Sequence, residues 1–292
     1  MEIRTKSKTL RQDRGIKITF TVIFTIFSLL ILFPFAWILL NSFKNGFDEF
    51  SSSSWALPKK WMFSNYTLVF TYEEFNIVNM FINTLILCFI VPTVGQISTI
   101  LAAYVMAKYK FKGQKILYVV YILPMLVSIT GTLTSTFLLL EKWGLLYNFA
   151  GIIVMSCGGT GFNFLMMYSL FKGVSDTYSE AATIDGAGHF RIFGQIMLPH
   201  VMGLAGTMWI LGFIGVWNDY TTPKIFLGED YLTIATGVEK IGELVEETVT
   251  SGLANNYPAY FAAVILSLIP VVTLFFIFQK QIMKMSLGGG IK

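Results

Sequence analysis

Residues 18–40 read ITFTVIFTIFSLLILFPFAWILL, a run of 23 residues without a charged side chain. A helix of about 20 apolar residues crosses the roughly 30 Å hydrocarbon layer of a bilayer, so this run predicts a membrane span. A basic segment precedes the run, as in a secretory signal peptide. However, the run is too long for a signal core, and no small-residue cleavage site follows it. We therefore expect it to stay in the mature protein as the first span.

The composition of the whole chain agrees with a membrane location. Of its 292 residues, 54% are hydrophobic, 16% are aromatic and only 13% are charged, which is too apolar for a soluble domain of this size. Five further uncharged or nearly uncharged runs are long enough to span a bilayer: residues 77–107, 116–140, 144–171, 199–222 and 257–279. The sequence therefore predicts an all-α integral membrane protein, with six transmembrane helices in one domain over residues 18–282.

The distribution of charge predicts the orientation of these spans. Basic residues collect in segments 1–17, 108–115 and 283–292, and positively charged segments stay in the cytoplasm. Acidic residues instead collect in the segments that alternate with these along the chain. The two longest of them, 41–76 and 225–256, are expected outside the cell. Both termini are therefore predicted to be cytoplasmic. The net charge of +4 lies in short clusters between apolar runs, so we expect the lipid bilayer, and no nucleic acid, as a partner.

The residues that enzymes and metal sites use are scarce. Cys88 and Cys157 each lie in an uncharged run and are interpreted as small core residues. His189 and His200 stand apart from any cluster with metal-ligand spacing. The glycine-rich end at residues 287–292 lacks the spacing and the hydroxyl residue of a phosphate-binding loop. We therefore expect a protein that is not an enzyme and holds no cofactor or metal of its own.

The connector between the fourth and fifth predicted spans, residues 173–198, is the most informative polar segment. From position 175 to position 199 the chain reads SDTYSEAATIDGAGHFRIFGQIMLP. Thr177 followed by Glu180 has the spacing of a capping box, and Gly186 suits a left-handed helix end. The resulting helix of about two turns is too short to be stable alone, so it must pack on something. A second short helix should follow, with Phe190, Phe193 and Met197 on the face toward the bilayer or the helix bundle.

The same segment carries the spacing Glu180-Ala181-Ala182, then Gly186, then Ile196-Met197-Leu198-Pro199. In this it resembles the cytoplasmic loop of binding-protein-dependent ABC importer permeases. Other short motifs look like the carbohydrate, maltose-type branch of that family: Asn65-Tyr66, Leu101-Ala102-Ala103-Tyr104, Trp217-Asn218-Asp219-Tyr220 and the end Leu287-Gly288-Gly289-Gly290-Ile291-Lys292. The resemblance extends over nearly the whole chain.

The resemblance implies a type I ABC importer permease fold with a cytoplasmic coupling helix, in the plasma (inner) membrane of a bacterium. The permease would carry a sugar or oligosaccharide, together with a second, different permease subunit. An extracellular solute-binding protein would deliver the carbohydrate, and a cytoplasmic ATPase dimer would bind ATP and Mg and drive the cycle. The residues implied in coupling to the ATPase are Glu180, Ala181, Ala182, Asp185, Gly186 and Gly188.

Candidate substrate contacts are uncharged polar or aromatic side chains at membrane depth, because planar amides and rings recognise sugars. They are Thr160, Asn163, Trp209, Trp217, Asn218 and Tyr220, and the alternative interpretation is packing between helices. Asp219 is a further candidate, because its position near the outer end of the fifth span suits a gate or a substrate contact. An alternative function is an ion-gradient-driven secondary transporter or a channel. Such proteins place ionisable residues inside their spans, whereas here Asp219 alone approaches that depth. An intramembrane hydrolase would need a nucleophile and base on facing helices, and the spans offer no such pair.

Overall fold

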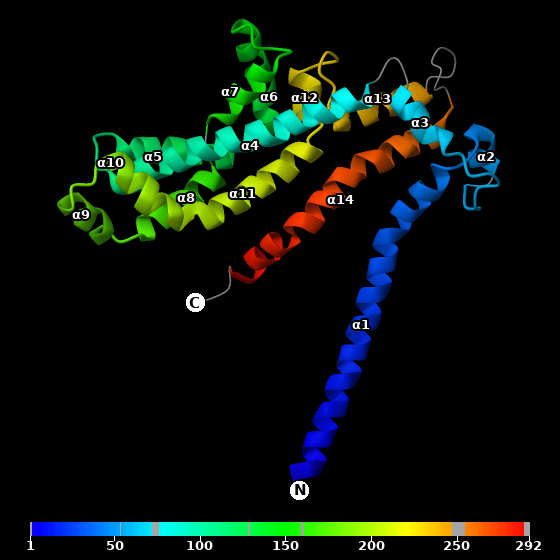
Figure 1. Ribbon diagram of the computed structural model, residues 1–292, viewed down its shortest axis with the longest axis horizontal. Coiled ribbons are helices and arrows are strands. Elements are labelled where there is room, and N and C mark those ends of the chain that lie inside the picture. The colour runs from blue at the N-terminus through cyan, green and yellow to red at the C-terminus, as the bar shows by residue number, and fades with distance from the viewer. Residues whose placement is uncertain are drawn as a thin grey trace. The chain divides into compact units, whose positions relative to one another are not determined.

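The computed structural model describes residues 2–52, 54–71, 76–127, 129–158, 161–246 and 255–288. Every regular element in these ranges is helical (Figure 1). The elements are α1 (Glu2–Asn41), α2 (Gly46–Ser52), α3 (Ser64–Thr71), α4 (Ile77–Lys108), α5 (Gln114–Ile122), η1 (Leu123–Leu126), α6 (Ile129–Lys142), α7 (Phe149–Ser156), α8 (Phe162–Gly173), α9 (Thr177–Ile184), α10 (His189–Arg191), η2 (Ile192–Met197), α11 (Leu198–Asn218), α12 (Thr221–Phe226), α13 (Ile234–Glu246) and α14 (Tyr257–Gly288).

The chain divides into two compact units. Unit 1 contains Met1–Glu73 and Lys240–Leu266, and unit 2 contains Glu74–Glu239 and Ser267–Lys292. Unit 1 therefore holds α1, α2 and α3, while unit 2 holds the helices from α4 to α12. Helices α13 and α14 contribute residues to both units.

In unit 2, helix α4 packs along both α8 and α11 (Figure 1). Small residues allow these backbones to approach closely. A Cβ atom added to Gly212 of α11 would lie 3.2 Å from the Cβ of Pro92, and one added to Gly95 would lie 3.3 Å from the carbonyl oxygen of Ser156. Because lipid tails are as apolar as the helices, such close packing is what holds membrane helices together.

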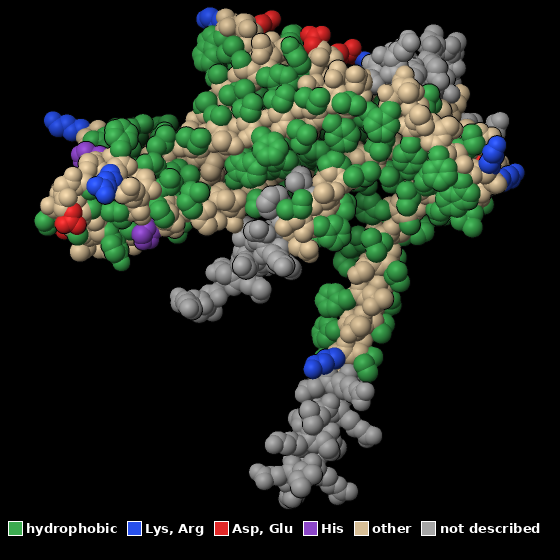
Figure 2. Space-filling model, in the orientation of Figure 1, with side chains coloured by type: hydrophobic (Ala, Val, Ile, Leu, Met, Phe, Trp, Pro, Cys, Tyr) green, Lys and Arg blue, Asp and Glu red, His purple; other side chains and the backbone are tan. Residues whose placement is uncertain are grey.

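The outer faces of unit 2 are apolar. Hydrophobic side chains cover most of the visible face of α4 and α11, and charged side chains gather near α9 and α10 (Figure 2). Large residues such as Ile97 and Leu211 are about half exposed, which water would not tolerate over so wide a surface. The surface is that of a protein whose solvent is lipid.

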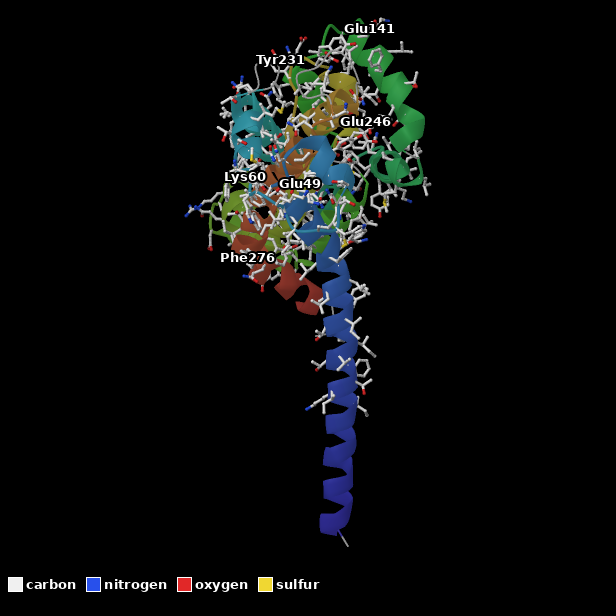
Figure 3. The ribbon with its side chains drawn as sticks, turned by 90° about the vertical axis from the view of Figure 1, so that its right-hand side faces the viewer. Glu49, Lys60, Glu141, Tyr231, Glu246 and Phe276 are labelled. Carbon is white, nitrogen blue, oxygen red and sulfur yellow. The ribbon has the colours of Figure 1, made fainter. Side chains whose placement is uncertain are left out.

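In unit 1, the part of α1 from Ile16 to Asn41 buries none of the side chains in its most apolar stretch. The chain beyond α1 folds around a few polar groups. The amide of Asn65 donates hydrogen bonds to the carbonyl oxygens of Ser42 and Lys44, at 2.8 and 2.9 Å. The Glu49 carboxylate (Figure 3) accepts from the backbone N–H groups of Lys59 and Asn45, which hold its pKa below the ordinary value. These bonds give the segment after α1 a defined structure.

Four helices in the described ranges are long and apolar enough to cross a membrane: Ile16–Asn41, Ile77–Lys108, His189–Asn218 and Tyr257–Ile277. They contain the first and second predicted spans and most of the fifth and sixth. The fifth starts ten residues earlier than predicted, since α10, η2 and α11 form one continuous helix. The helix ends at Asn218, and the last two residues of the predicted span, 221 and 222, belong to α12.

The third and fourth predicted spans are not single helices. The third, 116–140, is bent by 115° between Gln114–Leu126 and Gly131–Lys142. The first of these helices ends in a 3₁₀ turn that contains Pro124, which supplies no N–H donor. Counted as one span, this pair gives a fifth crossing. The fourth, 144–171, is divided into α7 and α8 at a glycine-rich stretch that ends at Gly161. Gly161 has φ +74°, and its N–H donates to the carbonyl oxygen of Tyr121 at 2.8 Å.

Candidate functional site

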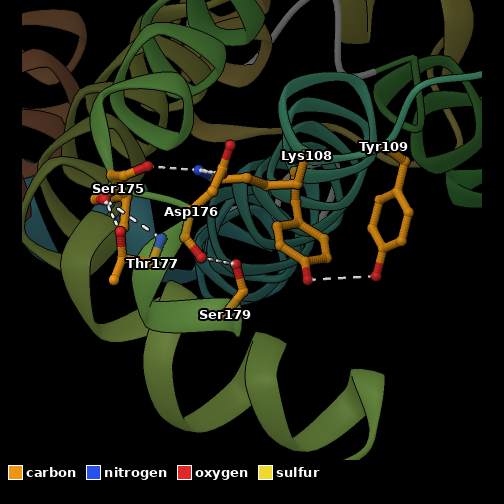
Figure 4. A network of polar contacts seen from close by, with 8 residues as sticks. Lys108, Tyr109, Ser175, Asp176, Thr177 and Ser179 are labelled. Carbon is orange, nitrogen blue, oxygen red and sulfur yellow. Dashed lines mark hydrogen bonds and ion pairs between the residues drawn. The ribbon is translucent and has the colours of Figure 1, made fainter. Parts of the chain in front are cut away.

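The short helix α9 lies between α8 and the long helix that begins at α10, where the sequence predicted a coupling helix. Its first residue is Thr177, and its N-cap is Asp176, one residue before the predicted cap. The hydroxyl of Ser175 donates to that of Thr177 at 3.0 Å, and the hydroxyl of Ser179 donates to the carbonyl oxygen of Asp176 at 2.8 Å (Figure 4). The predicted capping box of Thr177 and Glu180 is therefore wrong.

The C-terminal end of α9 follows the prediction. Gly186 has φ +79°, and its N–H donates to the carbonyl oxygen of Thr183 at 3.0 Å. The N–H of Ala187 donates to the carbonyl oxygen of Ala182 at 2.9 Å. These two bonds form a Schellman motif, and both alanines pack against the same hydrophobic core. The left-handed helix end predicted at Gly186 is confirmed.

The outward face of α9 is exposed and partly apolar. Ala182 is its buried residue, whereas Glu180, Ala181 and Asp185 are exposed, and Ile184 is 87% exposed. After Gly188, the N-cap of α10, Phe190 is 94% exposed. Two large apolar side chains held outward next to two carboxylates are suited to contact another protein.

The predicted apolar face of Phe190, Phe193 and Met197 does not form. Met197 is fully buried and Phe193 is partly buried in the core of unit 2, but Phe190 points away from it. The reason is the wider π turn of η2 over Ile192–Met197, which changes the residues that share a face.

Helix α9 is joined to the end of α4 by polar contacts that the sequence did not predict. The Lys108 ammonium lies 2.7 Å from the Asp176 carboxylate and also donates to the carbonyl oxygen of Val174 (Figure 4). The Tyr109 hydroxyl lies 3.2 Å from Nδ1 of His189. A cleft of about 480 Å³ separates α9 from the end of α4 between these contacts.

The predicted substrate contacts on α11 fall into two groups. Trp217 is buried with Cys88 and Phe213, and the indole N–H of Trp209 donates to the hydroxyl of Thr93 at 2.9 Å. Both tryptophans therefore belong to the seam between α4 and α11.

The other group lies at or beyond the end of α11. Asn218 is exposed and its amide donates to the carbonyl oxygen of Ile214, while Tyr220 is also exposed. The Asp219 carboxylate accepts from the N–H of Thr222 at 3.0 Å, which shapes the turn into α12. Asn163 is exposed in the first turn of α8, and Thr160 lies outside the described residues.

Sequence reasoning missed one buried polar side chain in this region. Gln96, in the middle of α4, is 8% exposed, and its amide nitrogen has no hydrogen-bond partner in the part of the chain that the structure describes. The sequence did offer a signal for this residue, because an amide side chain in the middle of an apolar span is unusual.

The described chain is all-helical, with several helices long enough to cross a membrane and a short capped helix between α8 and the long helix His189–Asn218. Residues 97–284 match the model of the binding-protein-dependent transport system inner membrane component, and the chain belongs to that family. It is therefore a permease component of a binding-protein-dependent importer, as the residues of the α9 segment predicted.

Two relatives and one solved structure are similar over most of the chain. Diacetylchitobiose uptake system permease protein NgcG of Streptomyces coelicolor is 28% identical over 259 residues, which cover 88% of this chain and 83% of the relative. Maltodextrin transport system permease protein MalD of Streptococcus pneumoniae is 29% identical over 91% of each chain. The fold matches a chain of a bacterial ABC transporter involved in alginate import, with a TM-score of 0.78 at 24% identity over 92% of this chain and 97% of that chain.

Proposed function

We propose that this permease carries a sugar or oligosaccharide across the bacterial inner membrane in an ATP-driven importer. The names of its relatives support a carbohydrate, since they include permeases for diacetylchitobiose and maltodextrin. The observation that carries the proposal is α9, a Schellman-capped helix whose Ile184 side chain is 87% exposed, next to the 94% exposed Phe190. A helix of eight residues keeps such a surface only if another protein covers it.

In the proposed assembly, that surface docks on a cytoplasmic ATPase dimer, which binds ATP and Mg. The contact residues would be Glu180, Ala181, Asp185, Gly186 and Gly188, which are exposed. Ala182, which the resemblance also implied, is buried in the core of unit 2 and so is not among them. A second, different permease completes the pathway, and an extracellular solute-binding protein supplies the carbohydrate. Asn218 and Tyr220, both exposed at the end of α11, are the proposed substrate contacts. ATP-driven closure of the dimer would move α9 together with the long helix that follows it from His189.

The test is uptake by the reconstituted importer. Proteoliposomes holding this chain, its partner permease and the ATPase should take up labelled maltotriose or diacetylchitobiose when the ATPase side is loaded with ATP and the binding protein is present. An imposed proton or sodium gradient without ATP should give none. Uptake driven by the ion gradient alone would support the secondary-transporter alternative and reject the proposal. So would a panel of sugars in which none is transported.

The proposed topology places both termini and α9 in the cytoplasm. Single cysteines at the exposed positions 52 and 246 should react with an impermeant thiol reagent in intact cells, and a cysteine at Lys112 should react only after the cells are opened. The background is a variant in which Cys88 and Cys157 are replaced by serine or alanine. Labelling of position 112 in intact cells, with positions 52 and 246 protected, would invert the topology.

A further inference from the structure

The last residue of α4 and its C-cap place two consecutive side chains against residues on either side of α9. Lys108 reaches the N-terminal end, where its ammonium donates to the carbonyl oxygen of Val174 and to the carboxylate of Asp176. The adjacent Tyr109 reaches the C-terminal flank, where its hydroxyl lies 3.2 Å from Nδ1 of His189. His189 is the first residue of the long helix that continues into α11.

Packing alone does not fix the distance between α9 and α4. The cleft of about 480 Å³ lies between them, and its walls include Tyr104, Ser179 and Thr183. On the α9 side, Ala182 and Ala187 reach the hydrophobic core, and both side chains are small. The polar contacts at either end therefore position α9 against α4.

The Lys108 contact is a strong one. Its side chain is 8% exposed, whereas that of Asp176 is 74% exposed, so the ammonium depends on its two acceptors in place of water. The ammonium holds the pKa of Asp176 below its ordinary value. A carboxylate with a lowered pKa keeps its charge above that pKa and loses it only in stronger acid, so the Asp176 carboxylate stays charged throughout the physiological range.

We infer that Lys108 and Tyr109 form a two-point strap through which movement of α9 reaches α4. The chain itself already joins α9 to α11, and the strap adds the helix that packs along both α8 and α11. Both residues are positioning residues, and the inference rests on the proposed coupling role of α9. Without the strap, the ATPase would still dock, but α9 would move within the cleft without moving α4 by the same amount.

The experiment measures sugar transported per ATP hydrolysed in proteoliposomes, together with the amount of ATPase that co-purifies. Lys108→Met keeps the apolar stem and removes the ammonium, and Asp176→Asn removes the charge of the acceptor. Each should retain the ATPase and its basal hydrolysis but lower the transport ratio by about tenfold, the scale of one charge-assisted hydrogen bond. Tyr109→Phe should lower the ratio less, because its contact of 3.2 Å is longer than the 2.7 Å contact between Lys108 and Asp176.

Two variants serve as controls. Asp176→Glu keeps the carboxylate at an exposed position and should restore a ratio close to that of the wild type. Lys112→Met removes an exposed lysine between α4 and α5 and should have no effect. A structural defect would lower expression and ATPase retention in the Asn and Glu variants alike.

The outcomes separate the strap from the proposed function. Wild-type stoichiometry in Lys108→Met and Asp176→Asn would overturn the strap while the importer assignment stood. Loss of the ATPase in proportion to lost uptake would also overturn the strap, because the contacts would then serve docking alone. Failure of the wild-type complex to couple ATP to sugar uptake would instead reject the proposed function.

Discussion

ATP-driven uptake should fall by roughly 5- to 150-fold when Gly186 is replaced by valine, while the protein still inserts in the membrane. Gly186 has φ +79°, where a β-branched side chain is strained by about 1–3 kcal/mol. A Cβ atom at this position would meet no atom of the described chain within 4 Å, so the cost is in the backbone and not in a clash. Relief of that strain would disrupt the Schellman motif, in which the N–H of Ala187 donates to the carbonyl oxygen of Ala182.

A series at this position tests that reasoning. Asparagine tolerates the left-handed conformation, so we expect uptake to decrease from Gly186→Asn to Gly186→Ala to Gly186→Val. The matched control is Gly173→Val, at an exposed glycine without positive φ whose surroundings are also open. A loss of 1–3 kcal/mol corresponds to roughly 5- to 150-fold in the population of the docked conformation. Normal uptake and normal ATPase retention in Gly186→Val would remove the strongest support for α9 as the coupling helix.

The long helices could be predicted from the sequence because lipid imposes a minimum length of apolar chain. The broken ones could not, since hydropathy counts apolar residues and ignores whether the backbone continues. Residues 144–171 are uncharged throughout, yet α7 ends at Ser156 and α8 begins only at Phe162. The N–H of Gly161 finds its acceptor on α5, a partner that no local pattern reveals.

The candidate site shows the same division between local and distant interactions. The helix end at Gly186 depends on its own neighbours and was predicted correctly. The predicted capping box assumed that Glu180 serves the helix start, but the N-cap is Asp176, whose carboxylate bonds to Lys108. Lys108 is 68 residues away in the chain, so the sequence shows it only as one basic residue among several.

Truncation of Trp217 to alanine should destabilise the protein, whereas truncation of the adjacent Asn218 should not. Trp217 is 5% exposed and its ring is stacked on that of Phe213, with centroids 6.4 Å apart. In a membrane the indole ring has apolar surroundings both when the helices are packed together and when they are separated in lipid. Its removal therefore costs little of the free energy that transfer from water contributes in a soluble protein. The lost packing remains, and we expect a decrease of about 2 kcal/mol in the free energy of unfolding.

The measurement is the thermal midpoint of the purified complex in detergent, followed by size-exclusion chromatography, with uptake assayed below the midpoint of each variant. Asn218 is exposed and bonds only to the carbonyl oxygen of Ile214 one turn earlier among the contacts described, so Asn218→Ala should keep the wild-type midpoint. If Asn218 also contacts the carbohydrate, its uptake should fall at unchanged stability. The opposite pattern, an unaltered midpoint with lost uptake in Trp217→Ala, would show that the indole acts on the substrate and not on the packing of α4 against α11.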